Sequence, residues 1–165
     1  MNNTRKLTYT AIIAAITTIS SNIVYIPLGF VKVFPIQHIA NILSAVLLGP
    51  WYAVLQAFVT STLRILLGTG TIFAYPGSMI GALFASILFA KTKKIAFAGI
   101  GEVFGTGIIG AIATYPIAVL FLGQKASLFG LVPAFAMSSF TGAIMGYALL
   151  KILSKNQVFV HILSK

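Results

Sequence analysis

The side chains that could carry out chemistry in this 165-residue chain are few and mostly neutral. The chain contains one acidic residue, Glu102, two histidines and no cysteine, against eleven lysines and arginines. One carboxylate cannot supply the paired acids of general acid–base or two-metal catalysis, and His38 and His161 are too far apart in the chain for a zinc motif. We therefore expect no enzymatic activity, no metal site and no cofactor.

A group of neutral polar residues opens one of the expected helices. His38 and Asn41 are three residues apart and Gln37 and Asn41 are four apart, so all three lie on one helix face. Neutral hydrogen-bonding groups that share a face of an otherwise apolar helix are suited to holding a small ligand.

Aromatic rings and hydroxyl groups occur where other helices begin or break. In Tyr75-Pro-Gly-Ser78 and Thr114-Tyr115-Pro116 they either bind a ligand or satisfy backbone groups freed by the proline. Together with the polar helix face, they predict a pocket for a small, nearly neutral heterocycle. We expect its ring to stack on Phe34, Tyr75 and Tyr115, and its polar atoms to bond Gln37, His38, Asn41 and Ser78.

Two charged residues, Arg64 and Glu102, complete the candidate substrate-binding set. Arg64 lies four residues before Gly68, about 6 Å from the end of its helix, where its stem can also carry the guanidinium out to the headgroup region. Glu102 lies eight residues after Lys94, so a direct ion pair with Arg64 would need its helix to start late or tilt. It is either part of the site or a structural anchor bonded to Thr106 or a neighbouring helix.

Composition and charge placement indicate a protein that lies in a lipid bilayer. The chain is 59% hydrophobic and only 7% charged, whereas about a quarter of residues in globular proteins are charged. Its cations fall in short clusters between long apolar runs, which is the pattern of cytoplasmic membrane loops. Nucleic-acid binding would instead gather them on one exposed face, so we expect no nucleic-acid partner despite the net charge of +10.

The expected fold class is an all-α integral membrane protein, a six-transmembrane-helix bundle with cytoplasmic N and C termini. Gly49-Pro50 divides one long apolar segment into two, because proline disrupts a helix interior. The division gives an even number of crossings between the cationic N-terminus and the Lys91 cluster, as a shared cytoplasmic side requires. The single domain covers 1–155 with a cytoplasmic tail at 156–165, and its spans lie near 7–26, 36–49, 51–67, 77–91, 95–122 and 128–150.

Small residues are interpreted mainly as helix-packing positions. Gly105-Thr-Gly-Ile-Ile-Gly110 matches the letters of a dinucleotide fingerprint, but no strand precedes it and no acid follows, so close helix packing is favoured. Ala11-x-x-x-Ala15, with Ala14 beside it, either packs within the bundle or forms a flat patch that docks another membrane protein.

Several sequence blocks resemble ThiW, a group among the substrate-binding S components of energy-coupling factor (ECF) vitamin transporters that is associated with hydroxyethylthiazole. The resemblance covers nearly the whole chain up to about Asn156. It is carried by Lys32-Val-Phe-Pro-Ile-Gln-His38, Leu47-Leu-Gly-Pro-Trp-Tyr-Ala53, Leu67-Gly-Thr-Gly-Thr71, Tyr75-Pro-Gly-Ser-Met79 and Gly101-Glu-Val-Phe-Gly-Thr-Gly-Ile-Ile-Gly110.

The resemblance implies a high-affinity binding subunit of the prokaryotic plasma membrane that has no energy source of its own. A transmembrane coupling protein, facing Ala11 and Ala15, and two cytoplasmic ATPases would drive uptake of a thiamine precursor held near the outer surface. The alternatives are an S component for another small vitamin or heterocycle, and a membrane scaffold protein without a ligand.

Overall fold

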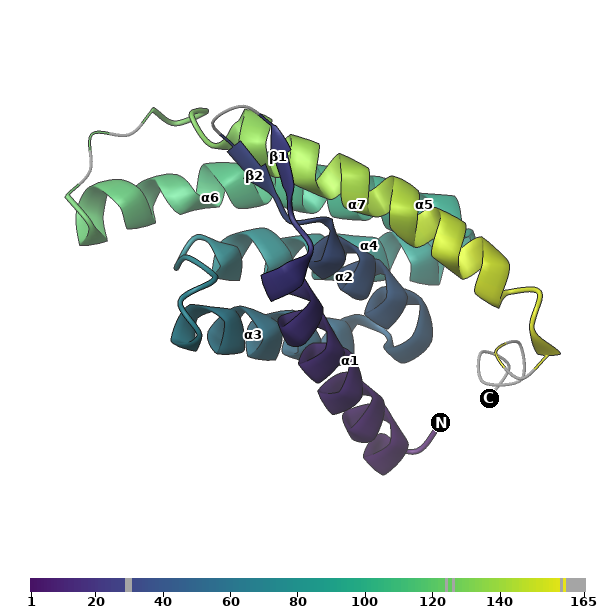
Figure 1. The fold of residues 1–165 in the computed structure, drawn as a ribbon. Helices are drawn as coiled ribbons and strands as arrows, with labels where there is room; N and C mark the ends of the chain where they lie inside the picture. The colour runs from purple at the N-terminus through teal and green to yellow at the C-terminus, as the bar shows by residue number, and fades with distance from the viewer. Residues whose placement is uncertain (29–30, 124, 126, 158, 160–165) are drawn as a thin grey trace.

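The computed structural model describes residues 1–28, 31–123, 125, 127–157 and 159, and in these it is helical apart from one short hairpin (Figure 1). The residues from 95 to 121 form a single continuous rod in which two π-helical segments, η1 and η2, interrupt the α-helix. In chain order the elements are α1 Asn3–Ile23, β1 Ile26–Leu28, β2 Val31–Val33, α2 Pro35–Leu48, α3 Pro50–Leu66, α4 Ala74–Thr92, α5 Ile95–Phe104, η1 Gly105–Gly110, α6 Ala111–Pro116, η2 Ile117–Phe121 and α7 Val132–Leu153.

The helix ends follow from proline and from residues with positive φ. Pro35 and Pro50 occupy the first turns of α2 and α3, where a missing N–H costs no helix bond. Gly49, between these helices, has φ 82°, and Lys93 ends α4 in the left-handed region with φ 56°. The chain therefore turns at Gly49-Pro50, and α2 and α3 pack side by side.

Three helical segments of the described residues are long and apolar enough to cross a membrane: Ala74–Thr92, Ile95–Phe121 and Val132–Leu153. The apolar helix α2 has only 14 residues, about 21 Å at 1.5 Å per residue, and it would reach across only with local bilayer thinning or polar flanks. The helical class is thus established, whereas six crossings and cytoplasmic termini stay predictions.

The strands β1 and β2 are an addition to the expected all-α fold. They pair antiparallel, with Ile26 opposite Val33 and Leu28 opposite Val31, in the segment for which the sequence predicted an irregular loop. β-Branched residues favour such a ladder, and the hairpin leads directly into Phe34 and α2. The backbone before the polar helix face is therefore a hairpin rather than an irregular loop.

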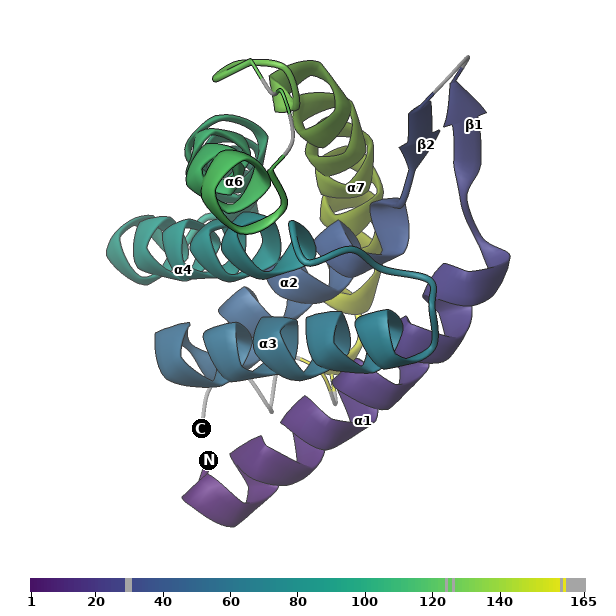
Figure 2. The same cartoon turned by 90° about the vertical axis from the view of Figure 1, so that its left-hand side faces the viewer.

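The helices are arranged in three layers, with α2 and α4 in the middle (Figures 1 and 2). Helices α1 and α3 cover one side of this pair, and the 95–121 rod and α7 cover the other. The core between them is built largely from alanines, which allow the helices to approach closely. Its buried members include Ala45, Ala53, Ala57, Ala82, Ala85 and Ala98.

Glycines bring the rod into backbone contact with α4. A Cβ added at Gly105 would lie 2.9 Å from Cα of Gly81, and one added at Gly110 would lie 2.7 Å from Cα of Gly77. The packing interpretation of these glycines is confirmed, because the stretch that resembles a dinucleotide fingerprint forms η1 and lies against α4.

Substituting Gly101 by alanine is expected to destabilise the contact between α4 and α5. The new Cβ would lie 2.6 Å from the backbone O of Phe84, so the helices must separate, at a cost of about 1–3 kcal/mol. Thermal unfolding in detergent should show a lower midpoint. Gly99→Ala on the same helix is the matched control, because its Cβ would meet only the Cβ of Ala143 at 3.7 Å. Equal midpoints for the two variants would contradict this account of the packing.

Candidate substrate-binding site

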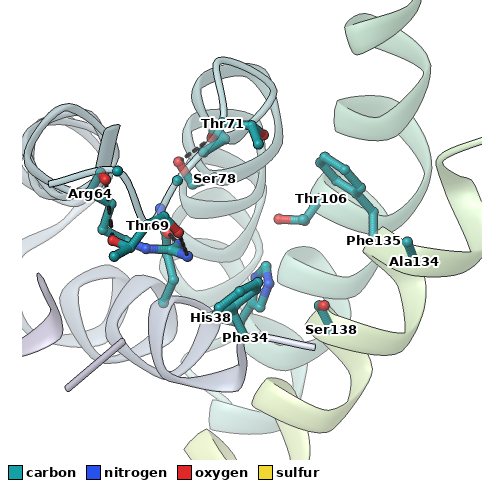
Figure 3. Close-up of a pocket in the computed structure, with 14 residues that line it drawn as sticks. Phe34, His38, Arg64, Thr69, Thr71, Ser78, Thr106, Ala134, Phe135 and Ser138 are labelled. Atoms are coloured by element: carbon teal, nitrogen blue, oxygen red, sulfur yellow. Dashed lines mark hydrogen bonds between the residues drawn. The ribbon is translucent and has the colours of Figure 1, made fainter. Parts of the chain in front are cut away.

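A cavity of about 320 Å³ lies where the N-terminal ends of α2, α4 and α7 meet the C-terminal end of α3 and the η1 segment. Figure 3 shows side chains from all of these elements directed into it. The loop 67–73 between α3 and α4 closes one side. Its polar and aromatic lining consists of Phe34, Gln37, His38, Arg64, Thr69, Thr71, Ser78, Thr106, Phe135 and Ser138.

The polar face of α2 is directed into the bundle. Gln37 and His38 line the cavity, and Asn41, one turn further along, is fully buried behind them. Gln37 Nε2 donates to Ser61 Oγ at 3.0 Å, and Ser61 Oγ lies 2.9 Å from Ser78 Oγ. This chain of hydrogen bonds ties α2 to α3 and α4 along the cavity wall.

Arg64 is directed inward, with 5% of its surface exposed. Its Nη1 donates to Gln37 Oε1, its Nη2 donates to the backbone O of Thr69 at 3.2 Å, and the guanidinium lies 4.8 Å from the ring centroid of Phe34. Extension to the headgroup region is therefore wrong for this side chain. Its Nε is buried and has no hydrogen-bond partner, which leaves a charged donor at the cavity unused.

Glu102 is fully buried at the centre of a second set of hydrogen bonds. Its Oε1 lies 2.8 Å from His38 Nδ1 and accepts from Asn41 Nδ2 at 2.9 Å. Thr106 Oγ1 lies 2.9 Å from the same oxygen and 3.0 Å from the backbone O of Gly77, and its one proton serves one of these acceptors at a time. The anchoring role considered for Glu102 is therefore the one that these contacts support, with partners on α2 and η1.

Four of the sequence-predicted site residues do not line the cavity. Asn41 and Glu102 stand behind its wall, as described. The Tyr75 hydroxyl lies 3.0 Å from Thr62 Oγ1, and its ring packs on Phe58 with centroids 5.5 Å apart. Tyr115 is half-buried on α6, outside the cavity lining. Stacking of Tyr75 and Tyr115 on a ligand is not supported by these positions.

Several lining residues were not identified from the sequence. Thr69 and Thr71 belong to a Gly-Thr repeat that was noticed only as a family block, and Thr106 was considered only as a partner for Glu102. Phe135 and Ser138 lie on α7, where apolar and small residues occur on every face, so no periodicity distinguishes an inner side. For these two residues the sequence holds no usable signal.

The alanines of α1 divide between two faces. Ala14 is buried against the bundle, whereas Ala11 and Ala15 are exposed. They lie among exposed apolar side chains, including Ile12 and Ile16. A docking patch on α1 would therefore be formed by Ala11 and Ala15, with Ala14 serving internal packing.

The fold and the cavity together define a helical membrane protein with an enclosed polar site for a small molecule, the class to which membrane transport proteins belong. Residues 7–156 match the family described as thiamine-precursor transporter protein (ThiW), and the chain belongs to this family. The resemblance seen in the sequence blocks is thereby confirmed. The chain has no match among curated proteins. Membership points to a transporter component rather than an enzyme.

Replacing Glu102 by alanine is expected to destabilise the bundle strongly. His38 Nδ1 and Asn41 Nδ2 would lose their shared acceptor in a water-free interior, at a cost of roughly 3–5 kcal/mol. Thermal unfolding in detergent measures the effect. Ser86→Ala is the control, because the Ser86 hydroxyl is buried but bonds only to Ala82 O of its own helix. A Glu102→Ala midpoint equal to that of Ser86→Ala would show that the network does not hold the helices together.

Proposed function

We propose that this chain is the substrate-binding subunit of an ECF-type importer and that its cavity takes up hydroxyethylthiazole or a closely related thiamine precursor. The observation that carries the proposal is the enclosed site itself. In a member of a thiamine-precursor transporter family, it combines aromatic rings, neutral hydrogen-bonding groups and one buried guanidinium.

The size and lining of the cavity suit a single small heterocycle. About 320 Å³ is near the lower limit of ligand pockets, which span roughly 300–1,000 Å³. Phe34 and Phe135 offer ring faces for a thiazole. Hydroxyl groups from Ser78, Thr106 and Ser138 offer hydrogen bonds for its ring nitrogen and side-chain hydroxyl.

Arg64 gives the site its main polar demand on a ligand. A buried donor without a partner costs about 1–3 kcal/mol, so a ligand oxygen or nitrogen that accepts from Arg64 Nε gains that amount on binding. Because Gln37 and Thr69 already hold the two terminal nitrogens, the guanidinium is oriented before the ligand arrives. Such preorganisation favours high affinity.

The remaining parts of the proposal concern assembly and orientation. The exposed alanines Ala11 and Ala15 allow close approach of a helix from a transmembrane coupling protein, to which two cytoplasmic ATPases would bind. Six crossings of a prokaryotic plasma membrane, with both termini in the cytoplasm, would place the cavity near the outer surface.

Filling the cavity is expected to abolish tight binding of hydroxyethylthiazole. Ala134 lines the cavity from α7, so Ala134→Phe should weaken binding roughly tenfold or more, equivalent to at least about 1.4 kcal/mol, in calorimetry on the detergent-purified protein. The matched control is Ala148→Phe, an exposed position on the same helix. If the wild-type protein binds another heterocycle from a competition panel but not hydroxyethylthiazole, the substrate assignment is wrong while the site stands.

Enlarging the α1 alanines is expected to separate binding from transport. Ala11→Leu combined with Ala15→Leu should abolish uptake of the labelled precursor by cells that also contain the coupling protein and the ATPases, because the docking helix could no longer approach closely. Calorimetry should show unchanged binding, because both side chains are exposed and far from the cavity lining. Ala90→Leu on α4, also exposed, serves as the control. Normal uptake by the double variant would exclude this patch as the coupling surface.

A further inference from the structure

A second hollow of about 470 Å³ lies between the rod and α7, separate from the substrate cavity. We name it the α5–α7 groove. The small residues Ala96, Gly99 and Ala143 leave space for it, and Phe104 and Phe140, which are 46% and 58% exposed, stand along it. The lining is apolar apart from the hydroxyl of a tyrosine and backbone groups.

Positive charge gathers at one end of this groove. A Cβ on Gly99 would lie 3.7 Å from the Cβ of Ala143, and α5 and α7 run antiparallel, so Lys94 is level with the turn of α7 that precedes Lys151. Figure 1 shows the start of α5 and the end of α7 at the same end of the molecule. Lys151 Nζ lies 5.7 Å from the ring centroid of Tyr147, which lines the groove.

These cations have no counter-ion in the chain. Its only acidic residue, Glu102, is fully buried and bonded to His38 and Asn41, whereas Lys94 and Lys151 are exposed. An apolar channel that ends at uncompensated lysines near a membrane surface has the two chemical features of an anionic phospholipid, an acyl chain and a phosphate.

A protein occupant fits less well. A second copy of this chain in the same orientation would bring its own lysines to the same depth, where like charges repel. The exposed alanine patch is on α1, in the layer on the far side of α2 and α4 from the groove, so a helix docked there would not reach it (Figure 2).

We propose that the α5–α7 groove binds one anionic phospholipid, with an acyl chain against Gly99 and Ala143 and the phosphate held by Lys94 and Lys151. The site does not depend on which substrate the other cavity takes.

Native mass spectrometry of the full chain in detergent tests the proposal with phosphatidylglycerol and phosphatidylcholine of identical acyl chains. The wild-type protein should retain one phosphatidylglycerol under conditions that remove phosphatidylcholine. Lys94→Gln combined with Lys151→Gln should weaken phosphatidylglycerol binding roughly 30-fold. Arg5→Gln combined with Lys125→Gln removes the same charge from exposed positions elsewhere and should change it less than about threefold.

A second pair of variants tests the groove itself. Ala96→Phe fills it from an exposed position and should also release the lipid, whereas Ala90→Phe on α4 should not. Equal retention of the two lipids, equal effects of the two charge-removing pairs, or normal lipid retention in Ala96→Phe would each overturn the proposal. A dimer that forms through the groove in place of lipid binding would overturn it as well.

Discussion

The structure depends on one buried carboxylate. Glu102 is the only acid in the chain, and three donors from α2 and η1 converge within hydrogen-bonding distance of a single oxygen of its side chain. A charge in an apolar interior is tolerated only when it is paired and hydrogen-bonded. The same contacts that satisfy Glu102 fix the position of His38 at the cavity, so the requirement for burying an acid also shapes the wall of the site.

Two polar systems of different character meet at this cavity. The Glu102 set links the middle layer to the rod, and the Arg64 set links α2 to α3 and the loop 67–73. The two charged residues do not pair with each other; each is held by neutral groups and, for Glu102, by a histidine. The carboxylate has its donors within the protein, whereas the guanidinium keeps one donor unused, which is the property expected of a residue that binds a ligand.

Much of the fold followed from simple rules, whereas the site followed only in part. Proline at Pro35 and Pro50, and apolar length from Ala74 onward, predicted where helices begin and which of them are long. The shared face of Gln37, His38 and Asn41 was recognised because polar residues stand out on an apolar helix. Tyr75 was misplaced because its position near a helix start does not specify which way its ring turns. Ser138 and Phe135 were missed because α7 is apolar on all sides, so only tertiary packing distinguishes its faces.

The π-helical segment η1 has a consequence for how this rod tolerates change. A wide turn closed by hydrogen bonds from residue i to i+5, such as that from Ala111 N–H to Thr106 O, accommodates one more residue than an α-helix would over the same length. Deleting one residue there would restore ordinary helical winding but swivel everything that follows by about 100°. Gly110 would then leave its seat against Gly77, and the surplus residue acts as a phase-setting device that aligns both halves of the rod with α4 at once.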